Sequence, residues 1–266
     1  MGTSSHPPFF ERYIGIDYSG ASMPTKALPG LRVYQSNRSE EAYEVKPPTG
    51  KSKHWTRSGI AAWLGEQLSQ EQPTLVGIDH GLSFPIQYFD QHRLALDWEA
   101  FLEDFQHHWP TDQDLVSVES VRQGYAGSGQ ARQGDSRWRR LTELRSRGAK
   151  SVFHFDVQGS VAKSTHAGLP WLLKLRQTLR QRIHFWPFDG WVLPLGSTVI
   201  VEAYPALSSR SYPREGRDEH QHDAYSIVRW MQEMDASGGL GSFFHPTLSR
   251  EELRVSSIEG WILGVM

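Results

Sequence analysis

Three short apolar runs in this sequence each carry an acidic residue at or near their end. Residues 12–18 and 74–81 both contain the tripeptide Gly-Ile-Asp, and residues 197–202 end in a third acid. The three acids are Asp17, Asp79 and Glu202. An apolar run of this length, followed by a turn-forming residue, is typical of a buried strand. We therefore expect three carboxylates at the ends of three strands.

The carboxyl ends of parallel strands meet at one crevice, so these carboxylates would lie together if their strands are parallel neighbours. A fourth acid, Asp223, lies in a predicted helix whose apolar face includes Ile227, and we expect its side chain to point toward the same sheet edge. Two like charges about 4 Å apart repel by roughly 4 kcal/mol at an effective dielectric constant of about 20. Such a cluster needs cations or shared protons, and oxygen ligands without thiolates favour Mg²⁺ or Mn²⁺.

One segment of the chain is strongly basic. Its cationic side chains are Arg137, Arg139, Arg140, Arg145, Arg147 and Lys150. If the substrate is a nucleic acid, we expect Arg137, Arg139 and Arg140 to contact its phosphates. The alternative interpretation is that the run forms a solvated helix face.

Each of these residues could also have a purely structural role. An acid at the end of a strand is often a turn-former or a helix cap. His80 and His222 adjoin two of the acids and could act as ligands or general bases, but hydrogen-bonded structural roles are favoured for both. We do not count these histidines among the catalytic residues.

The elements that must position the acids form an α/β pattern. Weaker strands are predicted near 31–35 and 42–45, and a helix is predicted from about 58 to 70, so the first part of the chain follows the order β-β-β-α-β. Residues 85–196 separate the second and third strong strands. They carry predicted helices at 98–108 and 170–182, the latter with Pro170 in its first turn. We expect a single domain over residues 1–266 with 85–196 as an inserted or capping subdomain.

Composition restricts the function classes further. The 266 residues include no Cys, which excludes disulfides, thiolate metal sites and cysteine nucleophiles. No secretory signal or membrane-spanning run is evident, so we expect a soluble, cytoplasmic protein. The formal charge of −2 provides no global attraction to polyanions. The sequence motifs typical of serine hydrolases, zinc proteases and simple dehydrogenases do not occur.

Five sequence blocks together resemble a family of predicted nucleases catalogued as domain of unknown function 429. The blocks are Gly15-Ile16-Asp17, Gly77 to Pro85, Val201 to Ala206, His222-Asp223-Ala224-Tyr225 and Glu259 to Gly264. The resemblance implies an RNase H-like fold with a mixed five-stranded sheet flanked by helices. It also implies a first-strand Asp that bridges two metal ions, and Asp17 matches that place, while Asp79 and Asp223 match further carboxylates. Glu202 is an extra acid after the last strand, and the long insertion departs from a minimal RNase H domain.

The leading hypothesis is two-metal hydrolysis of a phosphodiester, with Asp17, Asp79, Glu202 and Asp223 as the cage. The substrate would be a nucleic acid or a small phosphodiester. One alternative is a nucleotide-binding phosphotransferase or ATPase of actin-like fold, because residues 17–20 could present backbone amides to a phosphate. Another is a non-catalytic binding protein that keeps the fold.

Overall fold

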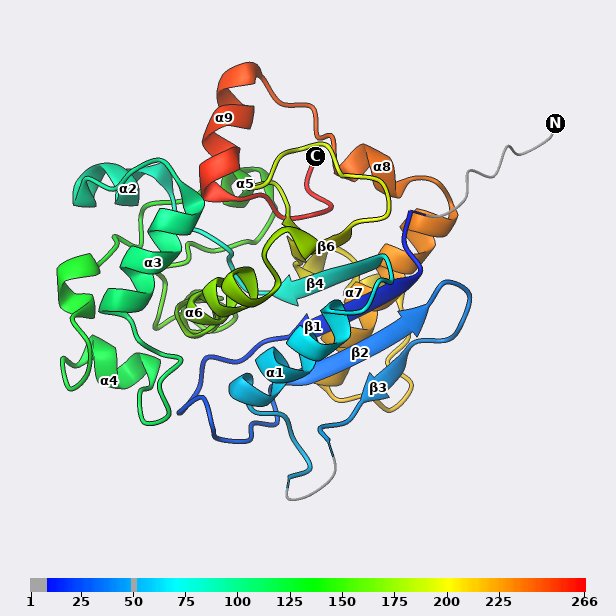
Figure 1. Cartoon of the computed structure of the whole chain (residues 1–266), viewed down its shortest axis with the longest axis horizontal. Coiled ribbons are helices and arrows are strands. Elements are labelled where there is room, and N and C mark those ends of the chain that lie inside the picture. The colour runs from blue at the N-terminus through cyan, green and yellow to red at the C-terminus, as the bar shows by residue number, and fades with distance from the viewer. Residues whose placement is uncertain (1–8, 49–51) are drawn as a thin grey trace.

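A computed structural model describes residues 9–48 and 52–266, and it contains a six-stranded mixed sheet flanked by helices on both faces (Figure 1). The order across the sheet is β3-β2-β1-β4-β6-β5. The strands are β1 (Arg12–Asp17), β2 (Arg32–Asn37), β3 (Tyr43–Val45), β4 (Thr74–Asp79), β5 (Ile183–Phe185) and β6 (Thr198–Glu202). Strand β2 is antiparallel to its neighbours β1 and β3, whereas β1, β4, β6 and β5 run parallel. The central strands are buried on both faces, which explains why they are continuous apolar runs in the sequence.

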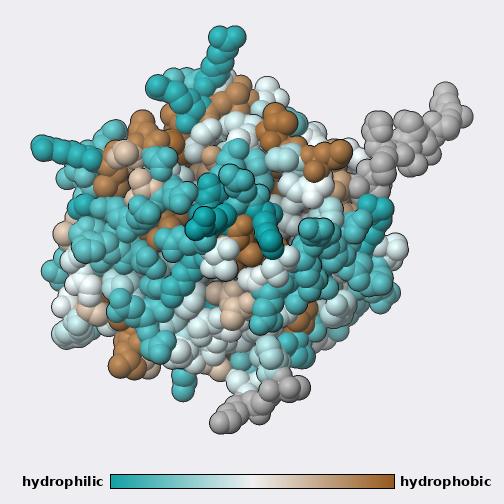
Figure 2. Space-filling view, viewed as in Figure 1, coloured by the Kyte–Doolittle hydropathy of each residue, from teal (hydrophilic) through white to brown (hydrophobic). Residues whose placement is uncertain are grey.

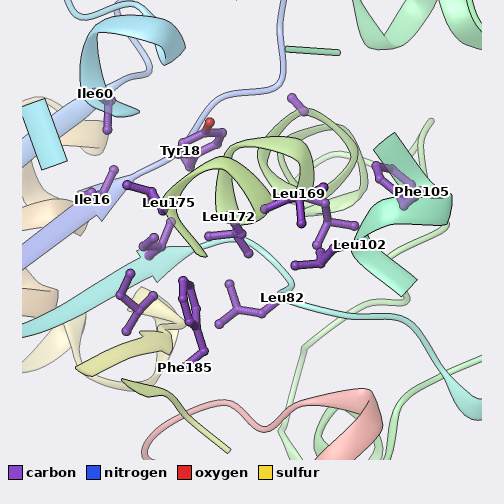
Figure 3. Packing of buried hydrophobic residues seen from close by; sticks show 14 of the residues in the cluster. Ile16, Tyr18, Ile60, Leu82, Leu102, Phe105, Leu169, Leu172, Leu175 and Phe185 are labelled. Carbon is purple, nitrogen blue, oxygen red and sulfur yellow. The ribbon is translucent and has the colours of Figure 1, made fainter. Parts of the chain in front are cut away.

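One long helix covers one face of the sheet and two helices cover the other. Helix α7 (Glu219–Ala236) packs on β1 and β2, and α1 (Arg57–Leu68) and α6 (Ala162–Leu179) pack together on the opposite face. Figure 3 shows side chains of α6, labelled Leu169, Leu172 and Leu175, gathered with those of the sheet.

The remaining helices are short or peripheral. The α-helices are α2 (Ile86–His92), α3 (Trp98–His108), α4 (Val118–Arg122), α5 (Leu141–Arg145), α8 (Leu240–Phe243) and α9 (Arg250–Glu259). Single turns of 3₁₀-helix lie at Gly129–Arg132, Arg180–Arg182, Pro205–Leu207 and Ser209–Ser211.

The predicted order β-β-β-α-β is confirmed for the first part of the chain, but the prediction of five strands is wrong. The sixth strand is β5, which has only three residues and pairs with β6 at the sheet edge. So short a run carries too little alternation to be recognised as a strand.

Helix α6 begins at Ala162, eight residues before the predicted start at Pro170, so Pro170 lies inside the helix. A proline has no N–H to donate to the carbonyl four residues earlier, which here belongs to His166. The hydroxyl of Thr111 donates to this carbonyl oxygen at 2.7 Å instead. A side chain 55 positions away in the chain therefore makes the internal proline tolerable.

Residues 85–196 share their core with the sheet. The apolar cluster on the α6 face includes Ile14 and Val76 of the strands together with Phe101 of α3 and Leu172 of α6. The division into a domain and an inserted subdomain stays a prediction. Within the described residues, no helix combines the length and the apolar character needed to cross a membrane. The face drawn in Figure 2 is mainly hydrophilic, with apolar residues in small separate groups.

Candidate functional site

Asp17 and Asp79 end two neighbouring parallel strands in the same register. The pairing of β1 with β4 places Asp17 beside Asp79, just as Gly15 lies beside Gly77. Because side chains two residues apart share one face of a sheet, each Asp lies on the same face as the glycine that precedes it by two positions. That face is the one covered by α7.

The two glycines let α7 approach the sheet closely. A Cβ atom at Gly15 would lie 2.4 Å from the Ala224 carbonyl oxygen, and one at Gly77 would lie 2.6 Å from Cγ2 of Ile227. This close approach brings Asp223, the residue before Ala224, to the carboxyl ends of β1 and β4. Asp17, Asp79 and Asp223 line one cleft with a volume of about 760 Å³.

The three carboxylates lie in an environment that disfavours their charged forms. Burial raises the pKa of Asp17, which is 6% exposed. Burial, together with the charges of Asp17, Asp223 and Glu202, raises the pKa of Asp79 well above its usual range. Burial and the charge of Asp17 raise the pKa of Asp223 to about 6. Within the described part of the chain, no hydrogen-bond donor reaches the Asp79 or Asp223 carboxylate.

His220 is a site residue that the sequence analysis missed. Its Nδ1 lies 2.7 Å from Oδ2 of Asp17, and this hydrogen bond raises the pKa of the His220 imidazole. Helical spacing could have identified His220, since residues three apart share a helix face and His220 precedes Asp223 by three. His222 is adjacent to Asp223 in the sequence, and an adjacent residue points in another direction.

The two histidines with expected structural roles are both buried and hydrogen-bonded. Nε2 of His222 lies 2.9 Å from the Ser209 carbonyl oxygen, and Nδ1 of His80 lies 2.8 Å from the Gly81 carbonyl oxygen. Burial lowers the pKa of His80 to about 4, so its ring is neutral at physiological pH. Both contacts agree with structural roles.

Glu202 does not line the cleft of the three aspartates, contrary to the prediction, although its charge is close enough to raise the pKa of Asp79. Strand β6 pairs with β4 so that Glu202 lies beside Ile78, not beside Asp79. A shift of one residue places a side chain on the other face of a sheet. Glu202 therefore points away from α7 and receives hydrogen bonds of 2.6 Å from both terminal nitrogens of Arg140.

The basic segment does not form the expected phosphate-binding surface. Arg140 is fully buried and bonds to Glu143 as well as Glu202, so it cannot contact a phosphate in solution. Arg139 donates to the carbonyl oxygens of Glu143 and Ala149. Arg137 is exposed and pairs with Asp135. Each of the three guanidinium groups is thus engaged within the protein.

A larger hollow of about 1010 Å³ lies at the opposite end of the sheet, where β5 and β6 begin. Its wall includes Arg176, whose charge is already matched by ion pairs with Asp189 at 2.6 Å and Glu99 at 3.2 Å. Open α/β sheets bind ligands at the carboxyl ends of their strands. The carboxylate cleft is therefore the stronger candidate site.

The donor set of the carboxylate cleft suits a hard divalent cation. Asp17, Asp79 and Asp223 offer only oxygen ligands, and a cation would offset the burial and the negative charge that raise their pKa values. Among residues 9–48 and 52–266, no group of three or more His, Asp or Glu side chains has the geometry of a complete metal site. Mg²⁺ typically uses one or two carboxylates and keeps several water molecules, so two of these acids with water and substrate oxygens would suffice.

Comparisons with protein-family models, with curated proteins and with solved structures give no significant match. The family resemblance of the five sequence blocks stays a prediction. The function must be inferred from the geometry of the cleft.

Proposed function

We propose that this protein is a divalent-metal-dependent phosphodiesterase with an RNase H-like fold, and that the carboxylate cleft is its active site. The observation that carries the proposal is the convergence of Asp17, Asp79 and Asp223, all with raised pKa values, at the carboxyl ends of two parallel strands. Clustered groups with perturbed pKa values in a cleft are typical of functional sites.

The strand arrangement supports the fold proposal. Three antiparallel strands are followed by parallel neighbours in the order β3-β2-β1-β4-β6, with α7 placing an acid against the first strand. The short strand β5 adds an edge to the five strands that the resemblance implies.

Asp17, Asp79 and Asp223 would hold Mg²⁺ or Mn²⁺, which when bound supplies an activated water and neutralises developing charge on the phosphate. The protein contributes the arrangement of its own groups. His220 fixes the orientation of Asp17, and the close packing of α7 keeps Asp223 beside the strand ends. Glu202 contributes indirectly, because its pairing with Arg140 holds the end of β6 against the segment before β5.

Packing after β1 weakens the alternative of an actin-like phosphotransferase. That hypothesis needs the backbone of residues 17–20 to be open to a phosphate. A Cβ atom at Gly20 would lie 1.9 Å from the Lys163 carbonyl oxygen, so the start of α6 covers this turn.

Thermal melts with EDTA and with Mg²⁺ test the metal site. Wild type should gain about 2.7 kcal/mol at a hundredfold excess of Mg²⁺ over Kd, and Asp17→Asn and Asp79→Asn should lose most of this gain. Asp114→Asn is the matched control, since Asp114 is exposed and lies outside the cleft. Hydrolysis of bis(p-nitrophenyl) phosphate should follow the same pattern. If neither Mg²⁺ nor Mn²⁺ changes the melting temperature of wild type, the proposal loses its basis and a non-catalytic binding protein is favoured.

A further inference from the structure

Two arginines that the sequence analysis did not single out line the carboxylate cleft. Arg210 and Arg214 lie in the segment between β6 and α7, and both are exposed. In the described part of the chain no hydrogen bond or ion pair engages either guanidinium group. Arg214 and Asp223 line the same cleft.

The segment that carries these arginines is anchored on both sides of Arg210. The Ser209 carbonyl oxygen lies 2.9 Å from Nε2 of the buried His222. The Tyr212 hydroxyl donates to Oε2 of Glu233 at 2.9 Å. Because both anchors lie on α7, Arg210 keeps a defined position relative to Asp223 on the same helix, and Arg214 follows the second anchor by two residues. An arginine at a prepared site binds phosphate with less loss of conformational freedom than one on a free loop.

The distribution of charge restricts the size of the anion. A protein that tracks a long nucleic acid needs a row of free cationic side chains. Here the basic segment is engaged internally, through Arg139 and Arg140 above all, and the formal charge of the chain is −2. Within the described residues, the cleft contains two free guanidinium groups, those of Arg210 and Arg214. A cleft of about 760 Å³ is in the range that holds small molecules.

On the premise of the proposed function, we infer that the substrate is a small phosphodiester of dinucleotide size whose phosphate is bound by Arg210 and Arg214 opposite the carboxylates. The guanidinium groups supply charge-assisted hydrogen bonds to the phosphate oxygens. Tyr204 and Tyr212, both partly buried in the same wall, offer aromatic surface to a base beside that phosphate.

Calorimetric titration of the full chain with the dinucleotide dTpdT, in millimolar Ca²⁺, tests this inference. The Arg210→Ala/Arg214→Ala variant should bind dTpdT at least about tenfold more weakly than wild type, because it loses two charge-assisted contacts. The methylphosphonate analogue of dTpdT lacks the phosphate charge, and it should bind wild type and variant alike. Decathymidylate should bind wild type with nearly the affinity of dTpdT.

The Arg147→Ala/Arg250→Ala variant is the matched control. Both residues are exposed and lie outside the cleft, and the two substitutions remove the same amount of positive charge. It should keep the wild-type affinity for dTpdT.

Unchanged dTpdT affinity in Arg210→Ala/Arg214→Ala, with the Asp17-dependent metal response intact, would overturn the inference and leave the proposed function standing. A DNA duplex of two helical turns that binds at least tenfold more tightly than dTpdT would also overturn it. If wild type shows no stabilisation by metal, the proposed function itself fails. If the double variant is unstable, the dTpdT affinity of the single variant Arg214→Ala serves as the test.

Discussion

Arg140 holds Glu202 with two hydrogen bonds of 2.6 Å, one from each terminal nitrogen, and both side chains are buried. This pair joins residues 62 positions apart, one in the long segment before β5 and one at the end of β6. Glu143 accepts a further bond from Nε of Arg140 at 2.8 Å. Two acids and one guanidinium group are therefore buried together.

Arg140→Ala should destabilise the protein by about 3–5 kcal/mol, because it leaves Glu202 and Glu143 buried without a cation. The measurement is urea unfolding at neutral pH. Arg137→Ala, at an exposed position three residues earlier, should change the free energy of unfolding by less than about 0.5 kcal/mol. If both variants have the same stability, Arg140 does not neutralise buried acids.

Gly15→Ala should lower stability by about 1–3 kcal/mol and weaken the Mg²⁺ response. The added methyl group would lie 2.4 Å from the Ala224 carbonyl oxygen, so α7 must move outward and carry Asp223 with it. Chemical unfolding and Mg²⁺-dependent melts measure the two effects.

Gly65→Ala on α1 is the control for Gly15→Ala. Apart from Gly65, its chain neighbours and the nearby backbone of α1, no atom lies within 4 Å of the Cβ position, so this substitution should stabilise the protein by up to about 1 kcal/mol through helix propensity. A Gly15→Ala protein that keeps wild-type stability and metal response would show that the approach of α7 does not depend on this glycine.

Thr111→Val should cost about 1–3 kcal/mol, because the His166 carbonyl oxygen loses its hydrogen-bond donor and Pro170 cannot replace it. Thr111→Ser retains the hydroxyl, and its stability should stay closer to wild type. Denaturant unfolding of the three proteins checks the order. Equal losses in Val and Ser variants would assign the effect to packing.

Acid should destabilise the protein through His166, which lies among aromatic rings that include Phe84, Trp109 and Phe155. Burial lowers the pKa of His166 to about 3 in the folded state. The unfolded chain binds a proton near pH 6.5. Stability is therefore lost as the pH falls from about 6.5 toward 3, by up to about 2 kcal/mol between pH 7 and 5 from this group alone.

His166→Gln should flatten this part of the stability profile, whereas His107→Gln, at an exposed position, should leave it unchanged. Urea unfolding between pH 5 and 7 gives the profile. Parallel profiles for wild type and His166→Gln would contradict a neutral buried imidazole.

The chain order of the first four strands and the positions of Asp17 and Asp79 could be predicted from the sequence, because local patterns encode them. Each acid follows an apolar run that is long enough for a buried strand, and the repeated Gly-Ile-Asp places a glycine on the same face as the acid. Asp223 could be assigned to the site because its helix has a recognisable apolar face. These inferences depend on spacings of two to four residues.

The other features of the site depend on contacts between distant segments, which sequence spacing does not determine. Glu202 faces away from Asp79 because β6 pairs with β4 one position out of step, and register is a property of two strands together. Arg140 is buried because Glu202 and Glu143 neutralise it, whereas the same run of arginines in isolation resembles a solvated surface. His220 reaches Asp17 only because the glycines at 15 and 77 let α7 lie close to the sheet. Local patterns determine which elements form, but the tertiary packing determines which side chains meet, because that depends on register, face and approach distance.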